Sequence, residues 1–290
     1  MDYLLNLVVS GIIIGSLYGI IAMGFAVIYR ATGMVNFAQG ELMMLTAYIA
    51  YALQIELDTG FVSTLLATVL IAMAVGAALE RLFIRPMLGE PMFSRVLVTI
   101  GLAVVIRSLV IIAWGAEARP FPAALPSDLI HIGPVSLYPA QVFVVASMAF
   151  LAFGSWLFFK FSRIGIAMRA TANSESTALL MGINVPRLYA VAWGISGVFA
   201  AFAGLSFALM FSLEPSMAYM GLRAFPATIL GGLDSVVGGA SAGIIIGVVE
   251  NLVGGYLGRG LKEIAGFALI VAVLMVRPYG MFGQREIERV

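Results

Sequence analysis

Three polar side chains that could do chemistry lie close together in an apolar part of the sequence. Asn36, Gln39 and Glu41 fall within six residues, at the start of a stretch that reads as a membrane helix. Such groups are costly in lipid, so they usually face a bundle interior or a water-filled cavity. They predict either part of a polar pathway across the membrane or hydrogen bonds that join helices.

A charged side chain also falls near the expected bilayer centre. Arg107 lies in the middle of a predicted span, residues 96–114, where a guanidinium needs a carboxylate partner or water. Glu250 is the first candidate counter-ion and Glu41 the second, because pairing offsets much of the cost of removing two charges from water. We therefore expect an intramembrane charge pair of Arg107 with Glu250, with either a structural or a transport role.

A second interrupted polar segment, residues 225–235, lies in the other half of the chain. It contains Pro226 and Thr228, and Asp234 follows two glycines near its end. Broken helices at membrane depth are tolerated where they are buried in protein or line a cavity, and paired interruptions in the two halves of a transporter point to its pathway. The candidate pathway residues are therefore Asn36, Gln39, Glu41, Thr228 and Asp234.

Composition excludes most other chemistry. The sequence has no Cys and a single His, His131, which removes disulfides, thiolate nucleophiles, Cys/His zinc sites and paired imidazoles. We expect no catalytic residue and no metal site. A formal net charge of +1 offers no basic surface for nucleic acid. The phosphate-cradling motif G-x-x-x-x-G-K-S/T does not occur, so the chain cannot itself use ATP.

Hydropathy predicts the elements that position these residues. The 290 residues are 62% hydrophobic and 11% charged, whereas soluble domains are about 45–50% apolar; the mean hydropathy is +1.06. We predict an all-α polytopic membrane helix bundle, a single transmembrane domain over residues 1–290, with about eight full spans and a short broken or re-entrant helix at 222–233. The predicted full spans are residues 5–28, 34–55, 60–79, 96–114, 140–159, 188–210, 235–257 and 263–276.

The distribution of Lys and Arg predicts the orientation. With the N-terminus outside, most basic residues fall in cytoplasmic segments, as is typical of short loops. That side then carries Arg30, Arg81, Arg85, Arg95, Lys160, Arg163, Arg169, Arg187, Arg277, Arg285 and Arg289. The C-terminal tail, residues 277–290, becomes cytoplasmic, which requires the segment 222–233 to have membrane depth.

The longest predicted cytoplasmic connection, residues 162–187, is amphipathic and predicts a short helix at the membrane face. Ala178, Leu179 and Met181 supply an apolar face, whereas Glu175 is polar. The helix either packs on its own bundle or docks into a groove of a soluble partner.

Glycines spaced four apart predict close helix packing in two spans. The two sets are Gly11, Gly15 and Gly19 in the first span and Gly239, Gly243 and Gly247 in the seventh. The spacing alone does not say which helix packs against either set.

Five segments together resemble the permease subunits of the high-affinity branched-chain amino acid ABC transporters, and the likeness covers nearly the whole chain. They are GSLYGIIAMGFAVIYRATGMVNFAQGELMML at 15–45, LERLFIRP at 79–86, RIGIAMRATANSESTALLMGINVPR at 163–187, FPATILGGLDSVVGGASAGIIIGVVE at 225–250 and RPYGMFGQ at 277–284. Gln39 stands where some members of the family carry His.

The resemblance implies a bacterial or archaeal inner-membrane permease for leucine, isoleucine and valine. It implies four kinds of partner: a second homologous permease, two cytoplasmic ATPase subunits that bind ATP and Mg, an extracytoplasmic substrate-binding protein, and the lipid bilayer. No cofactor is expected in this chain. The segment 163–187 is then similar to the coupling helix that fits the ATPase groove, with Arg169, Ala172, Asn173, Glu175, Ala178, Gly182 and Asn184 as the coupling positions.

Two alternatives remain open from the sequence. Related permeases are thought to carry urea, short-chain amides or other amino acids, and the residues do not select among these cargoes. A secondary transporter driven by an ion gradient would need protonatable groups deep in the bundle, for which Glu41, Asp234 and Glu250 are the candidates. That alternative leaves the segment 163–187 without a purpose.

Overall fold

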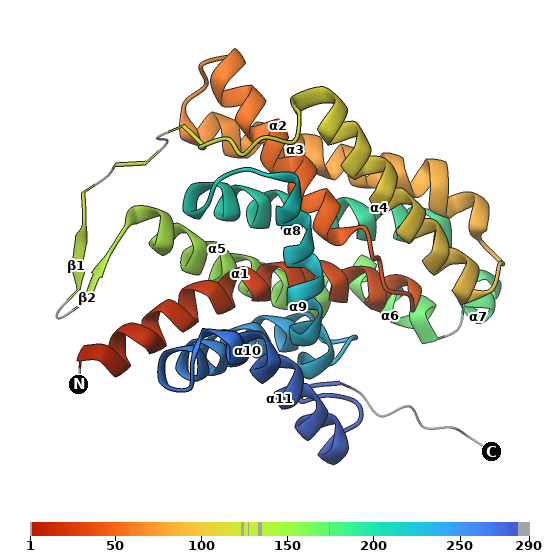
Figure 1. Cartoon of the computed structure of the whole chain (residues 1–290). Coiled ribbons are helices and arrows are strands. Elements are labelled where there is room, and N and C mark those ends of the chain that lie inside the picture. Colours follow the sequence, from red (N-terminus) through yellow and green to blue (C-terminus); the bar gives the residue numbers. More distant parts are fainter. Residues whose placement is uncertain (1, 123–124, 127, 133–134, 174, 284–290) are drawn as a thin grey trace.

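The computed structural model describes the chain except residues 1, 123–124, 127, 133–134, 174 and 284–290. The described residues are almost entirely helical, which confirms the all-α membrane bundle (Figure 1). The helices are α1 Asp2–Thr32, α2 Gln39–Glu56, α3 Phe61–Leu79, α4 Met92–Trp114, α5 Pro139–Phe161, α6 Arg163–Asn173, α7 Glu175–Leu180, α8 Val185–Met210, α9 Tyr219–Gly231, α10 Val236–Tyr256 and α11 Lys262–Val276. Helix α3 continues through a π-helical turn, Glu80–Ile84, and a 3-10 turn, Arg85–Met87.

Each of the eight predicted full spans coincides with a described helix. Six of these helices are long and apolar enough to cross a membrane: α1, α3 with its continuation, α4, α5, α8 and α10. Helix α2 has 18 residues but carries polar side chains at both ends, and α11 has 15 residues. The chain is thus a multi-pass membrane protein in which two of the eight helices are shorter or more polar than a standard span.

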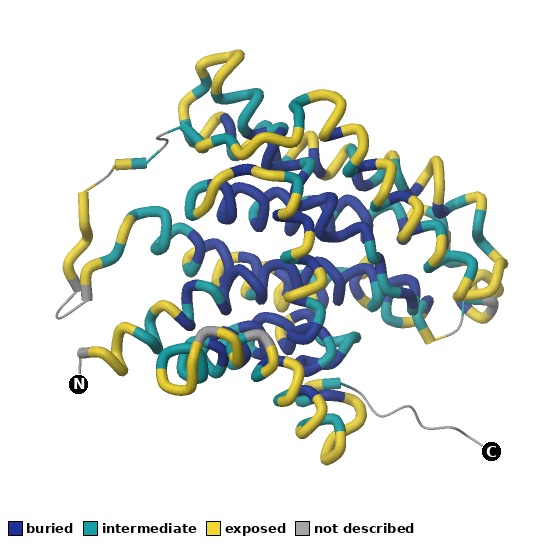
Figure 2. The backbone as a smooth tube through the Cα atoms, in the orientation of Figure 1, coloured by how far each residue is buried: buried dark blue, intermediate teal, exposed yellow. Residues whose placement is uncertain are grey.

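The two glycine sets predicted from the sequence face one another. Helix α1 runs through the buried centre of the bundle, and α10 packs along it (Figure 2). A Cβ atom on Gly15 would lie 2.6 Å from the Gly243 carbonyl oxygen, and one on Gly243 would lie 2.6 Å from Gly19 Cα. Because only glycine leaves room for such backbone contact, the two spacings together fix the α1–α10 interface.

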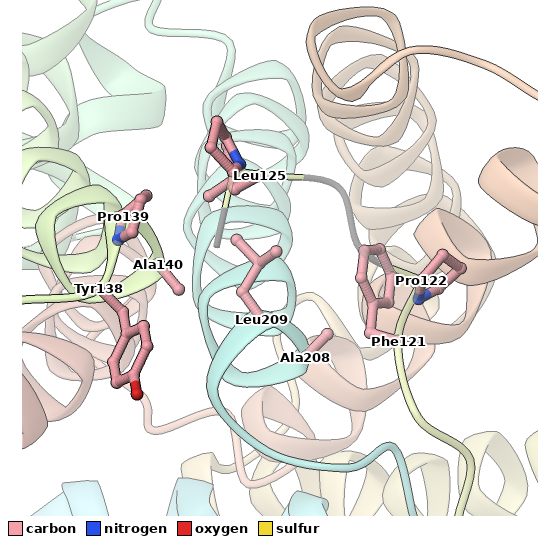
Figure 3. Close-up of a pocket in the computed structure, with 9 residues that line it drawn as sticks. Phe121, Pro122, Leu125, Tyr138, Pro139, Ala140, Ala208 and Leu209 are labelled. Atoms are coloured by element: carbon pink, nitrogen blue, oxygen red, sulfur yellow. The ribbon is translucent and has the colours of Figure 1, made fainter. Parts of the chain in front are cut away.

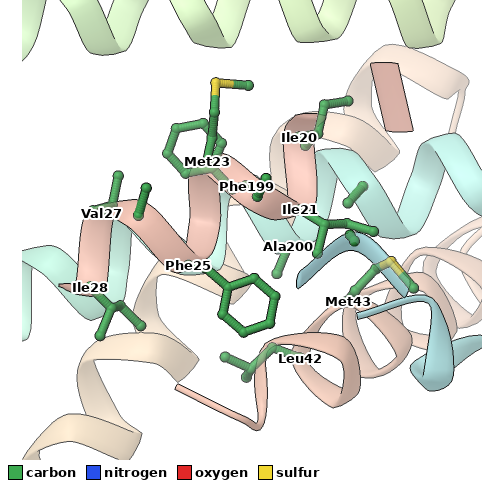
Figure 4. Close-up of a cluster of buried hydrophobic side chains, with 14 of the residues drawn as sticks. Ile20, Ile21, Met23, Phe25, Val27, Ile28, Leu42, Met43, Phe199 and Ala200 are labelled. Carbon is green, nitrogen blue, oxygen red and sulfur yellow. The ribbon is translucent and has the colours of Figure 1, made fainter. Parts of the chain in front are cut away.

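On the side of α1 that faces α2 and α8, apolar side chains from the three helices pack together. Ile21 and Phe25 of α1 lie between Leu42 and Met43 of α2 and Phe199 of α8 (Figure 4). All of these side chains are buried. This core holds the polar start of α2 in place against the centre of the bundle.

The chain unwinds between α1 and α2. Gly33 has φ +69°, a conformation that favours glycine, and the Asn36 side-chain oxygen accepts a hydrogen bond from the Ala38 N–H at 3.0 Å. This local bond competes with helix formation. Helix α2 therefore begins at Gln39 instead of residue 34, and Asn36 lies in the turn that precedes the helix.

The predicted short helix at 222–233 is present as α9, which has 13 residues and contains Pro226. It begins beside the start of α2, where a Cβ atom on Gly221 would lie 2.6 Å from Gly40 Cα. The start of α2 and the start of α9, far apart in the sequence, thus meet inside the bundle.

The two ends of the bundle carry different features (Figure 1). The N-terminus lies at one end with a small antiparallel sheet, β1 Ile130–Ile132 and β2 Val135–Leu137. Helices α6 and α7 lie at the opposite end. Residues 277–283 pack against the turn between α9 and α10, where the Met281 N–H donates to the Leu230 carbonyl at 2.8 Å. The predicted tail is therefore packed as far as residue 283, and 284–290 lie outside the described residues.

Candidate functional site

A groove of about 460 Å³ lies among α2, α4 and α9, at the place where the starts of α2 and α9 meet. Its lining is mostly apolar, with one acidic and one basic side chain. The lining residues are Phe37, Gly40, Glu41, Ile100, Ala103, Val104, Arg107, Ser108, Ile111, Ala218, Gly221 and Leu222. Apolar walls with a few convergent polar groups are typical of small-molecule sites.

The two charged residues of the groove form an ion pair. Arg107 Nη2 donates to Glu41 Oε1 at 2.6 Å, and the Arg107 guanidinium also lies 4.5 Å from the centre of the Tyr219 ring. A charge-assisted hydrogen bond and a cation–π contact together stabilise a guanidinium at membrane depth. The side chain of Arg107 remains 28% exposed, whereas that of Glu41 is 9% exposed.

The predicted pair of Arg107 with Glu250 is wrong. Glu250 lies on α10 and accepts a hydrogen bond from the Tyr18 hydroxyl of α1 at 3.0 Å. Its other oxygen lies against α11, 2.8 Å from the position of a Cβ atom on Gly266. Helix α4 packs on α2 and not on α10, so the second candidate, Glu41, is the carboxylate within reach of Arg107.

Gln39 joins three helices instead of facing the groove. Its side-chain oxygen accepts a hydrogen bond from Ser196 Oγ of α8 at 2.7 Å, and the same hydroxyl lies 3.1 Å from the Gly24 carbonyl of α1. Gln39 Nε2 donates back to the Ser196 carbonyl at 3.4 Å. Gln39 therefore forms interhelical hydrogen bonds, which was the alternative role expected for it from the sequence.

The remaining predicted pathway residues lie outside the groove lining. Asn36 caps the turn before α2 and is fully buried. Thr228 is buried within α9, and its hydroxyl finds no hydrogen-bond partner among the described residues. Asp234 lies in the α9–α10 turn beside the packed C-terminal segment, 3.2 Å from the position of a Cβ atom on Gly283. A pathway role for these three stays a prediction, and Glu41 alone of the predicted set lines the groove.

The predicted coupling helix is two helices, α6 and α7, followed by a turn into α8. Gly182 ends α7 with φ +77°, and Asn184 caps α8 by accepting the Arg187 N–H at 3.1 Å. Arg95 Nη1 of α4 lies 3.5 Å from Glu175 Oε2 of α7. The Tyr189 hydroxyl of α8 donates to the same carboxylate at 3.3 Å.

The tip of α7 is apolar and exposed. Leu179, Leu180 and Met181 are 52%, 87% and 76% exposed, whereas Ala178 packs inward against Tyr189. The prediction that Ala178, Leu179 and Met181 share one apolar face is therefore wrong for Ala178. Of the other predicted coupling positions, Asn173, Gly182 and Asn184 are exposed and Arg169, Ala172 and Glu175 are half-buried.

A second hollow, of about 210 Å³, lies at the end of the bundle that holds the N-terminus and the small sheet. Phe121, in the connection before β1, lies opposite Tyr138 and Ala140, and Leu125 and Leu209 lie between them (Figure 3). Among the described residues, no charged side chain and no predicted site residue lines this hollow. The α2–α4–α9 groove is therefore the candidate site.

Sequence reasoning missed several residues that build the site. Tyr219 covers the Arg107 guanidinium, Ser196 anchors Gln39, and Arg95 ties α4 to α7. None of them stands in a motif, because each acts through a contact between helices that are distant in the sequence. For Arg95, the one indication in the sequence was its position in a segment predicted to be cytoplasmic.

The family model described as branched-chain amino acid transport system / permease component matches residues 7–276. The chain belongs to this permease family. The permease is 30% identical to the high-affinity branched-chain amino acid transport system permease protein LivH of Escherichia coli K12, over 99% of this chain and 98% of that protein. It is 29% identical to BraD of Pseudomonas aeruginosa, with the same coverage. A probable branched-chain amino acid transport permease protein LivH of Methanocaldococcus jannaschii is 27% identical over 94% of this chain and 91% of that protein.

The family makes the chain a permease component of a transport system. Such a permease component is not an enzyme, in line with the expectation from composition. Among solved structures, a chain of PsaBC from Streptococcus pneumoniae in complex with Fab overlays on 93% of the permease and 91% of that chain, with a TM-score of 0.49 at 13% identity.

Proposed function

We propose that the permease is the membrane subunit of an ABC importer that moves leucine, isoleucine and valine across the inner membrane. The observation that carries this proposal is the match to high-affinity branched-chain amino acid permeases along nearly the full length of both chains. The apolar walls of the groove suit an aliphatic side chain.

In this proposal ATP and Mg are bound by two cytoplasmic ATPase subunits. The chain lacks a phosphate-cradling motif, so the energy has to come from a partner. The exposed tip of α7, from Leu179 to Met181, supports a docking role, because apolar side chains exposed outside the lipid favour burial in a groove of another protein. Importers of this kind open alternately to the two faces, driven by movement of the coupling segment.

A second permease and a substrate-binding protein complete the proposed assembly. Val104 and Leu222, two wall residues of the groove, are 63% and 52% exposed in the single chain. A second, homologous permease would cover this side. The binding protein would deliver cargo at the end that carries the N-terminus and the small sheet. The N-terminus is then outside and α6 and α7 are cytoplasmic, as the basic residues predict.

Uptake into proteoliposomes tests the proposal. The permease with its co-purifying partners and binding protein is reconstituted, and radiolabelled leucine uptake is measured with and without ATP, with urea as competitor. ATP-dependent leucine uptake that urea does not inhibit supports the proposal. ATP-dependent uptake of urea but not of leucine would contradict the proposed cargo and leave the ABC importer in place. Uptake driven by an ion gradient without ATP would contradict the ABC importer itself.

A further inference from the structure

We propose that Glu41 and Arg107 bind the two charged groups of an amino acid: Glu41 the α-ammonium and Arg107 the α-carboxylate. The cargo's side chain lies against the apolar wall of the same groove. This inference rests on the proposed function and adds to it a binding site for the zwitterion. It assigns the pair a recognition role in addition to its role in holding α2 and α4 together.

The groove presents both signs of charge side by side in an apolar setting. Arg107 Nη2 and Glu41 Oε1 are 2.6 Å apart, so the pair is neutral as a unit. A zwitterion that inserts between the two groups keeps the site neutral and exchanges one ion pair for two. A monocarboxylate or a monoamine would leave an uncompensated charge at membrane depth, which is strongly unfavourable. The pair therefore discriminates against cargo that carries a single charge.

Arg107 has capacity for a second acceptor. Its hydrogen bond to Glu41 uses Nη2 alone of its two terminal nitrogens, while Nε is buried and has no hydrogen-bond partner among the described residues. A guanidinium offers five N–H donors in a planar fork that matches a carboxylate. The Tyr219 ring lies 4.5 Å from the guanidinium and limits its movement. The side chain is partly exposed toward the groove, so a carboxylate reaches it without displacing a helix.

Another buried carboxylate of the membrane region, that of Glu250, lacks these features. Taken as whole residues, Glu250 and Glu41 are equally buried, with 7% of each exposed, but the Tyr18 hydroxyl and α11 close around Glu250. It lines neither hollow. Glu250 thus provides a matched control for the removal of a buried negative charge without any effect on the groove.

The walls of the groove account for the aliphatic part of the cargo. Ile100, Ala103, Val104, Ile111 and Leu222 line it, and its volume of about 460 Å³ lies within the usual range for small-molecule sites. The neighbouring Val105 is 49% exposed but does not line the groove. Val104 and Val105 therefore form a matched pair of positions, one inside the site and one outside it.

The absence of cysteine permits a direct binding test on the assembled importer. Single cysteines are introduced as Val104→Cys and Val105→Cys, and the rate of modification by a thiol reagent is measured on this chain. We expect leucine to slow modification at position 104 and not at 105. 4-Methylpentanoate, which lacks the ammonium, and isopentylamine, which lacks the carboxylate, should protect neither position. Absence of protection by leucine, or equal protection by a singly charged analogue, would overturn the inference.

Charge variants then identify the groups responsible. Arg107→Gln and Glu41→Gln in the Val104→Cys chain should each abolish protection by leucine and lower uptake by about tenfold, the loss expected for a hydrogen bond to a charged group, whereas Glu250→Gln should keep both. Should Arg107→Gln fail to assemble, Arg107→Lys keeps the charge but loses the fork, and protection should weaken. Full protection in an assembled Arg107→Gln or Arg107→Lys importer would overturn the inference, even though ATP-dependent leucine uptake by the unmodified importer would still support the proposed function.

Discussion

Arg95 Nη1 lies 3.5 Å from Glu175 Oε2, so the first turn of α4 is tied to the first residue of α7. The same α4 carries Arg107, which contacts Glu41 in the groove. One helix thus connects the surface at the end of the bundle to the interior. Both ion pairs are interhelical, and together they limit how far α4 moves relative to α7 and α2.

Reversing the charge at Glu175 should uncouple the permease without unfolding it. Glu175→Arg places like charges opposite each other at Arg95, where the original pair is partly exposed and contributes only about 0.2–1 kcal/mol. We expect normal amounts of folded protein but loss of ATPase co-purification and of leucine uptake. The double variant Arg95→Glu/Glu175→Arg should recover both, because it restores the pair. Normal uptake by the single variant would contradict the coupling role.

A charge at the α7 tip should prevent docking of the ATPase. Leu180 is 87% exposed and makes no core contact, so Leu180→Asp should leave the thermal unfolding temperature of the permease unchanged while ATPase binding is lost. Leu57→Asp is the control, since Leu57 is 65% exposed in the α2–α3 connection, away from α7. The docking role fails if the two variants bind the ATPase equally well in a pull-down.

Small additions to the α1–α10 interface should destabilise the bundle. Gly243→Ala places a methyl group 2.6 Å from Gly19 Cα, and overpacking of this kind costs about 1–3 kcal/mol. We expect a lower thermal midpoint and less monodisperse protein by size-exclusion chromatography. Gly101→Ala on α4 meets no atom within 4 Å and should be neutral or slightly stabilising. Equal behaviour of the two variants would contradict close α1–α10 packing.

Gln39 and Ser196 should behave as one structural unit. Ser196→Ala leaves the buried Gln39 oxygen without its 2.7 Å donor, and an unpaired buried polar group costs about 1–3 kcal/mol. Gln39→Leu should cost a similar amount, and the double variant should cost less than the sum of the two. Unfolding free energies from denaturant titration test this. A fully stable Gln39→Leu protein that no longer transports leucine would instead indicate a pathway role.

The sequence by itself determined the elements of the fold. Runs of apolar residues are a local property, so hydropathy located the eight helices predicted as full spans and the short α9 to within a few residues. Local chemistry also set some boundaries: the Asn36 side chain bonds its own backbone and delays the start of α2, a detail that hydropathy does not register. The resemblance carried by five motifs was enough to recognise the family.

The tertiary structure decided which residues meet. The glycine spacings predicted close packing in two spans, but only the packed bundle shows Gly15 against Gly243. Arg107 required a buried carboxylate, and its choice of Glu41 over Glu250 depends on α4 packing against α2, which no local pattern encodes. In the membrane interior a charged side chain loses its hydration, and this cost is offset only by a partner close enough to form a hydrogen bond. The packing of the helices therefore decides which carboxylate Arg107 can use.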